Sequence, residues 1–521
     1  CPMSITKMLR KLVRRPKKKP TRRGIPKGLA AKLAKLDKQF EKAEDLLVRK
    51  FAFGPTKIPA AIAYFKGMVD DAVIRQGLLR NAMLELRQVA PGKEHDEGSI
   101  LEMVKQVVTV AEMEQVDKWE DIIAHLLSGH AILMVEGMAP VLSIDVTGWE
   151  HRGVEQPIAE AVIRGPRDSF TESIRINITL IRRRLRDRSL KVEMYKLGSR
   201  TRTDVALMYI ADIIDPEVLA EAQKRLEAIK LDAILDSGYI EELIDDCWWS
   251  PFTTTQETER PDEVVAGLLE GRFAIVVDTS PFVVLAPTTI NTIMQSPEDY
   301  YLPWMVVSLV RLVRFVGSFI SLTLPAVYIS LIGYHPEMIP SRLAQSIAVA
   351  RDGIPFPSAT EAFLLEMALE LLREAGIRVP GPIGQSIGIV GGIIIGDAAV
   401  RAGLVGPVMV IVVAATAISS LLVPTYSFAL ALRNLRFVLM LLASFFGLFG
   451  VSMGMLAILA HLAALKSFGV SMLSPWSPLR VRDLQDSLIR LPRMALHRRP
   501  GLYQVQDPTR QEDELPEGKD H

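Results

Sequence analysis

The chain has 521 residues, a mean hydropathy of +0.22, 49% hydrophobic and 23% charged residues, and a net charge of +1. Its length exceeds one ordinary hydrophobic core, its hydropathy is high for a soluble protein, and its charge is high for a purely membranous one. The two cysteines, Cys1 and Cys247, exclude a disulfide framework and lack zinc-site spacing. The composition therefore predicts a soluble part and a membrane part that are segregated along the chain.

The chain begins with a basic segment that we expect to form a disordered arm. Fourteen Lys and Arg residues lie between Cys1 and Lys38, against the single acid Asp37. Such a segment repels itself and is attracted to anionic surfaces, where a leaflet of acidic lipids contributes about 1 kcal/mol per basic residue. Nucleic acid and acidic lipid are the two candidate partners, of which we expect membrane lipids and not nucleic acid. A solvated arm without a specific partner is the alternative.

The region after the arm has mixed α/β character. Apolar runs at 131–135 and 141–146, separated by a glycine, are typical of a hairpin of buried strands. Asp215 and Pro216 start an amphipathic helix with acids in its first turn, which the helix dipole favours. A second hairpin is expected to end at 273–277. These patterns predict two small α/β subdomains that meet near residue 146.

The second half of the chain contains the candidate membrane spans. About 20 apolar residues cross a bilayer core, and stretches of this kind occur only after residue 272. Between the first two spans, residues 359–375 form an amphipathic helix that either lies on the surface or plugs a vestibule. The predicted fold class is thus an α/β soluble N-terminal region followed by an α-helical polytopic membrane domain. The four predicted spans are Pro303 to Tyr334, Ile383 to Val400, Leu404 to Pro424 and Phe437 to Leu465.

The predicted domain organisation follows from these observations. A membrane domain of four to five spans lies between the α/β region and a basic, then acidic, cytoplasmic tail. The predicted boundaries are 1–44 for the arm, 45–146 and 147–272 for the subdomains, 273–466 for the membrane domain, and 467–521 for the tail.

Four spans place both ends of the chain on one side of the membrane. Residues 466–500 carry seven Lys and Arg residues against two acids, so the positive-inside rule predicts that both termini are cytoplasmic. Arg433 and Arg436 conflict with this prediction, because four spans place their loop outside. A re-entrant segment at 282–294 or a different number of spans would resolve the conflict.

Common enzyme motifs are absent from the sequence. No GxxxxGK[ST], GxSxG or HExxH pattern occurs. His125 and His130 lie five residues apart, a spacing that does not make a metal pair on one helix face. We therefore expect no enzyme activity, no catalytic residue, no cofactor and no metal.

A row of glycines at spacing four marks one face of a predicted membrane helix. This spacing allows the backbones of neighbouring helices to approach closely, either inside one subunit or at a homo-oligomer interface or conduction path. The glycines are Gly384, Gly388, Gly392 and Gly396.

Charged residues near this row are candidates for an ion path or gate. Asp397 and Arg401 lie one helical turn apart with Val400 beside them, and Arg311 and Arg314 lie in the first span. Intramembrane charges usually pair or line water, and an apolar ring beside them can gate by dewetting. An ion pair with only a structural role at the interface is the alternative.

Five arginines of the soluble region form a candidate interaction site. They can bind an anion or another subunit, or they can hold acids such as Glu172 and Asp187. These arginines are Arg164, Arg167, Arg182, Arg183 and Arg184.

Several segments resemble the A subunit of GerA-type spore germination receptors, and together they extend in order over residues 45–500. The sequence departs from the family pattern at Asp168–Ser169, Trp248–Trp249 and Ser471–Met472, and in its long basic arm. The segments that carry the resemblance are 164–172, 180–184, 250–262, 268–272, 287–289, 298–301, 335–340, 373–380 and 383–424.

The resemblance implies a subunit of a nutrient receptor in the inner membrane of the spore. Its implied partners are a transporter-like B subunit, which holds the nutrient, and a lipoprotein C subunit, and its implied activity is the release of monovalent cations by an oligomer. A secondary transporter remains an alternative because Pro407 and Pro424 can break helices. A membrane-anchored scaffold and the paralogue that is associated with the dipicolinate channel also stay open at this point.

Overall fold

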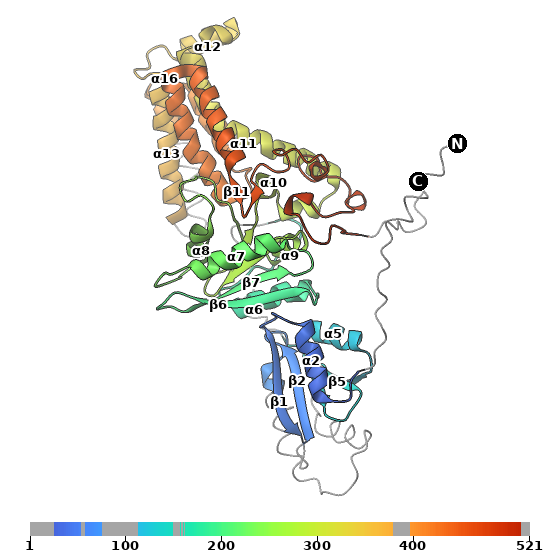
Figure 1. Ribbon diagram of the computed structural model, residues 1–521. Coiled ribbons are helices and arrows are strands. Elements are labelled where there is room, and N and C mark those ends of the chain that lie inside the picture. The colour runs from blue at the N-terminus through green and yellow to red at the C-terminus, as the bar shows by residue number, and fades with distance from the viewer. Residues whose placement is uncertain are drawn as a thin grey trace, which may run out of the picture. The chain divides into compact units, whose positions relative to one another are not determined.

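The computed structural model describes residues 25–53, 58–74, 113–148, 157, 160, 162–378 and 396–511 (Figure 1). The chain divides into two compact units. The first ends at residue 149, and the second holds residues 42–44 and everything from residue 150 onward.

The first unit is a five-stranded antiparallel sheet with two helices. Helix α2 (Leu29–Gln39) forms because Leu29, Leu33 and Leu36 repeat at helical spacing and are buried. Its Lys32 is also buried and donates to the carbonyl of Val135 at 3.3 Å. The arm predicted for residues 1–44 is therefore wrong for 29–39, which is helical. The other elements, in sheet order, are β1 (Leu46–Phe53), β2 (Ile58–Phe65), β4 (Ala131–Val135), β5 (Val141–Ile144) and β3 (Met113–Val116), with α5 (Trp119–Leu127).

The second unit contains another five-stranded antiparallel sheet, covered by helices on both faces. Side chains alternate along β7, so that Ala206 and Met208 pack with α6 and α9 while Val205 and Leu207 pack with α7 and α8. The sheet order is β6 (Leu190–Leu197), β7 (Thr203–Ile210), β9 (Phe273–Val277), β10 (Val283–Ala286) and β8 (Gln256–Thr258), and the helices are α6 (Ile174–Arg184), α7 (Pro216–Ala228), α8 (Ser237–Ile244) and α9 (Pro261–Leu269).

Two sequence predictions bear on this second sheet. Helix α7 starts as predicted, because Pro216 occupies its first turn and Asp215 caps the backbone N–H of Glu217 at 2.9 Å. The domain boundary at residue 272 is wrong, since β9 and β10 pair with β7 and with each other inside this sheet. The apolar run from residue 273 thus marks buried strands and not the start of the membrane domain.

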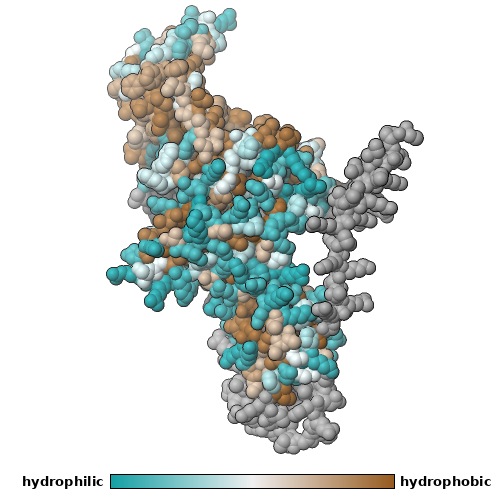
Figure 2. Space-filling view, viewed as in Figure 1, coloured by the Kyte–Doolittle hydropathy of each residue, from teal (hydrophilic) through white to brown (hydrophobic). Residues whose placement is uncertain are grey.

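The second half of the unit is a helical bundle whose surface is apolar, in contrast to the α/β part (Figure 2). Among the residues that the structure describes, two helices are long and apolar enough to cross a membrane, α11 and α16. The α/β region and this bundle confirm the predicted fold class. The bundle elements are α10 (Ile290–Ile293), η3 (Pro297–Tyr300), α11 (Trp304–Gly333), η4 (Pro336–Met338), α12 (Ser341–Ala350), α13 (Ser358–Arg378), α15 (Pro407–Ser420) and α16 (Tyr426–Ala464).

Helix α16 reverses direction at Gly447. A straight helix of 39 residues would be about 58 Å long. Instead, the rings of Phe428 and His461, near its two ends, both lie against Phe252. A Cβ atom on Gly450 would also collide with the backbone of Leu442, eight residues earlier in the chain. Gly447 has a φ of +57°, a conformation that glycine adopts without steric cost. The single predicted span at 437–465 is therefore wrong, because its residues belong to two antiparallel arms.

The segment after α16 packs on the second α/β sheet. Phe468 lies edge-on to Phe273, with ring centroids 5.0 Å apart, and Val505 contacts the core on the opposite face. The backbone N–H of Gln506 donates to the carbonyl of Ile213 at 3.0 Å. Residues 467–511 thus belong to the folded unit rather than to a free tail. The short elements here are β11 (Lys466–Ser467), β12 (Val470–Ser471), η5 (Asp483–Gln485), η6 (Arg493–Ala495) and η7 (Gly501–Tyr503).

Candidate functional site at the base of the helical bundle

Arg311 joins the first long helix to two other parts of the chain. It is buried two turns inside α11, where its Nε atom donates to Asp299 at 3.0 Å and its Nη1 atom donates to Asp486 at 2.8 Å. Nη1 also donates to the carbonyl of Ser487 at 2.9 Å, and Arg314 donates to Asp299 at 2.7 Å. One guanidinium group therefore connects α11, the turn η3 and the C-terminal segment, and we call this cluster the Arg311 junction.

Tyr300 completes the junction from the side of η3. Its hydroxyl lies 2.9 Å from a carboxylate oxygen of Asp486 and 3.0 Å from the side-chain oxygen of Gln295. The guanidinium groups of Arg490 and Arg311 lie over its ring at 5.3 and 5.7 Å. Burial, followed by the negative charge of Asp486, raises the pKa of Tyr300 well above its usual value. The phenol therefore stays protonated and can donate to either oxygen.

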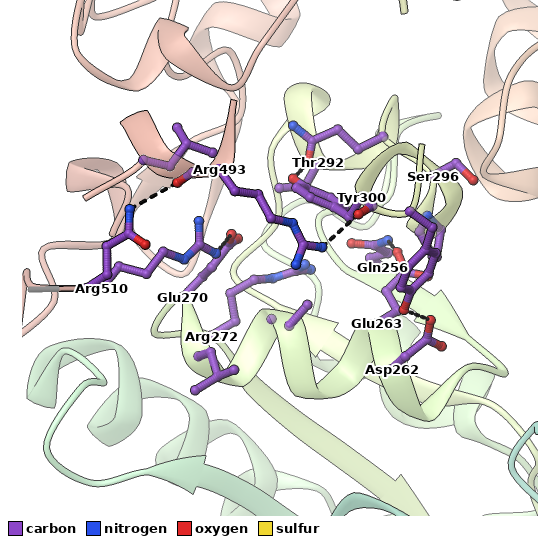
Figure 3. A pocket seen from close by; sticks show the side chains of 18 residues that line it. Gln256, Asp262, Glu263, Glu270, Arg272, Thr292, Ser296, Tyr300, Arg493 and Arg510 are labelled. Atoms are coloured by element: carbon purple, nitrogen blue, oxygen red, sulfur yellow. Dashed lines mark hydrogen bonds and ion pairs between the residues drawn. The ribbon is translucent and has the colours of Figure 1, made fainter. Parts of the chain in front are cut away.

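A cavity of about 370 Å³ lies beside the junction, between α9, η3 and the C-terminal segment (Figure 3). Arg493 reaches across it to donate to the carbonyl of Tyr300 at 2.7 Å, and Arg510 pairs with Glu270 at 2.9 Å. Its volume falls in the range of small-molecule pockets, and its walls carry charges of both signs. A molecule inside it would touch Tyr300 and thereby the Arg311 junction.

Carboxyl groups on the α9 side of the cavity are partly withdrawn from solvent. Burial raises the pKa of Glu263 to about 6, although the nearby Arg272 acts in the opposite direction. Burial likewise raises the pKa of Glu270 against the effect of Arg510. The carboxyl group of Glu263 therefore changes charge closer to neutral pH than an exposed carboxylate does.

Ion pairs also lie inside the bundle, where α13 contributes the acids and α16 the bases. Arg436 pairs with Glu366 at 2.7 Å, with both side chains fully buried, and Arg433 pairs with Glu370 at 3.2 Å. Nearer the other end, Glu361 accepts from the backbone N–H of Gly406 at 2.8 Å. Residues 359–375 thus belong to a helix of the bundle itself, where the acidic side chains of Glu361 and Glu366 are buried.

These pairs explain the orientation conflict found in the sequence. Arg433 and Arg436 are buried and neutralised by α13, so they are not loop residues to which the positive-inside rule applies. In the sequence, Glu366 and Glu370 stand out only as acids of an amphipathic helix. The two glutamates are four residues apart and the two arginines are three residues apart, so each pair lies on one face of its helix. This was the signal in the sequence for their pairing.

The remaining predicted gate residues lie in the described stretch 396–401, which is helical and precedes α15. Asp397 and Arg401 form an ion pair of 2.8 Å, with side chains that are 55% and 79% exposed. Val400 is half-buried and packs against the core of the bundle. Asp397 and Arg401 are brought together as a pair, whereas Arg311 and Arg314 have their own partners in the Arg311 junction, so a shared ion path remains a prediction.

The predicted glycine face is only partly described. Gly384, Gly388 and Gly392 lie outside the residues that the structure describes. A Cβ atom on Gly396 would meet a methyl group of Val410 at an ordinary contact distance of 3.6 Å. The oligomer face therefore remains a prediction.

The five arginines of the soluble region divide into different environments. Arg182 is buried and donates to the carbonyl of Leu190 at 3.4 Å, whereas Arg164 and Arg167 are exposed. Arg184 holds Asp168 at 2.5 Å. Burial alone would raise the pKa of Asp168, but the hydrogen bond and charge of Arg184 outweigh it and lower the pKa. The acid that Arg184 holds is thus neither Glu172 nor Asp187, and Arg183 is exposed on α6.

Two histidines of the first unit meet at one serine. The Nδ1 atoms of His125 and His130 lie 2.9 and 3.1 Å from the hydroxyl oxygen of the buried Ser143. Burial lowers the pKa of His130. Within the described part of the chain, no group of three or more His, Cys, Asp or Glu residues is arranged to hold a metal ion.

The fold and the site define a membrane protein with an α/β region and an apolar helical bundle, whose first long helix is tied by ion pairs to η3 and to the C-terminal segment. Residues 34–502 match the family described as Bacillus/Clostridium GerA spore germination protein, and the chain belongs to this family. It is 41% identical to the uncharacterized membrane protein YfkQ of Bacillus subtilis (strain 168), over 92% of each chain. It is 38% identical to spore germination protein KA of the same organism, over 95% of this chain and 90% of that protein.

Two further similarities complete the comparison. The chain is 39% identical to spore germination protein GerLA of Bacillus cereus, over 89% of this chain and 93% of that protein. It is also similar to the crystal structure of the N-terminal domain of the A subunit of the Bacillus megaterium spore germinant receptor GerK3. That similarity has a TM-score of 0.41 and 35% identity, and covers 51% of this chain and 97% of that one.

Proposed function

We propose that this chain is the membrane subunit of a nutrient germinant receptor in the inner membrane of the spore. In this proposal it acts as an oligomeric, ligand-gated cation channel or as a signalling subunit, and both of its termini are cytoplasmic. Its partners would be a transporter-like B subunit and a lipoprotein C subunit. Membership of the spore germination family supports the receptor role.

The exposed ion pair of Asp397 and Arg401 carries the proposal of a channel. The neighbouring exposed side chains of α15, such as Ile411 and Ile418, are apolar and suited to lipid. A charged pair on such a surface is costly in hydrocarbon, so it favours a place against water or another subunit. An oligomer that gathers copies of this surface around an axis would line a pore with the pair.

The Arg311 junction supports gating by the soluble region. Any movement of η3 or of the C-terminal segment would be transmitted to α11, because Arg311 donates to both. The cavity beside Tyr300 lies next to this connection. A ligand or partner that displaces Arg493 would therefore act on the base of a membrane helix.

Cation flux through the purified full-length chain in liposomes tests the proposal. Flux driven by a salt gradient alone is expected, and Asp397→Asn is expected to change its ion selectivity or the assembly of the oligomer. Flux that requires a co-transported substrate would indicate a secondary transporter. Absence of flux from both the isolated chain and the assembled receptor would contradict conduction and favour a scaffold.

A further inference from the structure

An apolar surface of the second α/β unit is exposed next to the bundle. Trp248 is 86% exposed and Trp249 is 64% exposed, in the loop that follows α8. Two exposed apolar side chains of α8, one helical turn apart, extend this area. We call the whole set the tryptophan surface, and it consists of Tyr239, Leu243, Trp248 and Trp249. A cluster of exposed large apolar residues of this kind marks an interaction site.

The loop that carries the tryptophans is attached to the ends of α16. The ring of Trp249 lies 4.9 Å from the ring of His461, and Ser250 shares a hydrogen bond of 2.9 Å with His461. Phe252 contacts the rings of both His461 and Phe428, at 6.2 and 5.6 Å. Phe428 lies in the first turn of α16 and His461 in its last turn. Because α16 reverses at Gly447, these two turns are the ends of its two antiparallel arms. The tryptophans therefore lie level with the ends of two apolar helices.

Two acids of this region, Glu241 and Asp246, are held by neighbouring side chains. Glu241 accepts a hydrogen bond from Thr255 at 2.6 Å, and Asp246 pairs with Arg225 at 2.6 Å. Glu242 remains exposed, so an anionic lipid is disfavoured relative to a zwitterionic one. In the described part of the chain, neither tryptophan donates a hydrogen bond through its indole N–H.

We propose that the tryptophan surface lies in the headgroup region of the bilayer and anchors the second α/β unit against zwitterionic lipids. Indole rings prefer this region because they combine a large apolar body with one N–H donor. The surface lies at the ends of the helix arms, where a bilayer passes from hydrocarbon to headgroups. The inference rests on the proposed place of this chain in the membrane, but not on ion conduction.

Fluorine NMR of the full-length chain in phosphatidylcholine nanodiscs tests the proposal. The measured quantity is the broadening of each tryptophan signal by a spin label at a known depth in the bilayer. The chain would carry fluorotryptophan, its six tryptophan signals would be assigned by single Trp→Phe variants, and the lipids would bear a spin label at the headgroup or deep in the acyl chain. The signals of Trp248 and Trp249 are expected to broaden strongly with the headgroup label and weakly with the deep label. Trp119, buried in the first unit, is expected to respond to neither.

Trp304 separates failure of this inference from failure of the membrane placement, because it is the first residue of α11. If Trp304 broadens with lipid labels while Trp248 and Trp249 do not, the anchor is refuted and the membrane placement stands. If none of the three broadens, the membrane placement itself fails. If Trp248 and Trp249 respond only to a spin label on a second copy of the chain, the surface is a subunit interface and the lipid proposal is overturned.

Discussion

Arg436 and Glu366 form an ion pair of 2.7 Å in which neither side chain is exposed. Replacing Arg436 with Met leaves the carboxylate of Glu366 buried without its partner, and removal of one member of such a pair typically costs about 3–5 kcal/mol. We expect Arg436→Met to lower the thermal unfolding temperature of the detergent-solubilised protein and its abundance in membranes.

The matched control replaces an exposed arginine on α12, Arg342, with Met and is expected to leave stability unchanged. Replacement of both partners, Arg436→Met with Glu366→Gln, removes the unpaired charge and is expected to recover most of the loss. A double variant as unstable as Arg436→Met alone would show that the pair does not stabilise the bundle through its charges.

The Arg311 junction predicts a local effect of a conservative substitution. Lysine keeps the charge of Arg311 but cannot direct donors to Asp299, Asp486 and Ser487 at once. We expect Arg311→Lys to speed hydrogen exchange in residues 483–490, consistent with buried acceptors that cost about 1–3 kcal/mol each when unpaired. Exchange unchanged in this segment but faster in α11 would indicate that the junction does not hold the C-terminal segment.

Two carboxyl groups that meet at Thr258 predict a pH dependence. The hydroxyl of Thr258 lies 2.6 Å from Glu160 and 3.1 Å from Glu263. Burial and the charge of Glu263 raise the pKa of Glu160 to about 8, and burial raises that of Glu263 to about 6. Because both pKa values are raised, the folded state binds protons that the unfolded state has lost. The stability that these two groups contribute is therefore fully present below about pH 4.5, and this contribution is lost as the pH rises to about 8.

Thermal unfolding between pH 5 and pH 9 measures this effect. Glu160→Gln is expected to flatten the decrease, since the amide cannot ionise. A decrease of the same size in Glu160→Gln would assign the pH dependence to other groups.

The reversal of α16 predicts that Gly450 tolerates no side chain. An added Cβ atom would collide with the carbonyl oxygen of Leu442 on the opposite arm, and the backbone there cannot easily move. We expect Gly450→Ala to destabilise the bundle by about 1–3 kcal/mol, the usual range for overpacking. Ser452→Ala, at an exposed position of the same arm, is the control. Equal unfolding temperatures of the two variants would argue against close contact of the arms.

Val400 provides the sharpest test of gating. If its side chain forms a dewetted constriction in an oligomer, Val400→Ala widens and wets the closed pore. Spores with this variant are then expected to germinate without nutrient or to be unstable during formation. If Val400 only packs in the bundle, its truncation lowers receptor abundance and slows germination. Normal receptor levels with a slower or unchanged response would contradict gating.

Features determined by neighbouring residues could be predicted from the sequence, and those determined by distant ones could not. Asp215 and Pro216 identified the start of α7 because capping is local. Nothing local shows that 273–277 pairs with β7, since an apolar run of this length suits a buried strand or the start of a membrane span. The turn at Gly447 was missed because the residues on both sides of it are equally apolar.

The candidate site shows the same division. Arg311 and Arg314 were found because charges stand out in an apolar helix, but Asp486, a partner of Arg311, lies 175 residues away in a segment predicted to be a tail. Glu366 and Arg436 are separated by 70 residues, and their pairing depends on how α13 and α16 pack. Hydropathy and composition thus locate charges, whereas the tertiary fold decides what neutralises them.

Phe468 and Val505 place a constraint on the order in which this protein is made. They pack on opposite faces of the sheet formed by β6 to β10, yet they follow the last apolar helix in the sequence. During translation the strands leave the ribosome before α11 to α16 enter the bilayer. The contacts of Phe468 and Val505 with the sheet cannot form until after that step. The final packing of the α/β region is therefore completed only after the membrane helices have been inserted, so correct insertion and completion of this core are linked in biosynthesis.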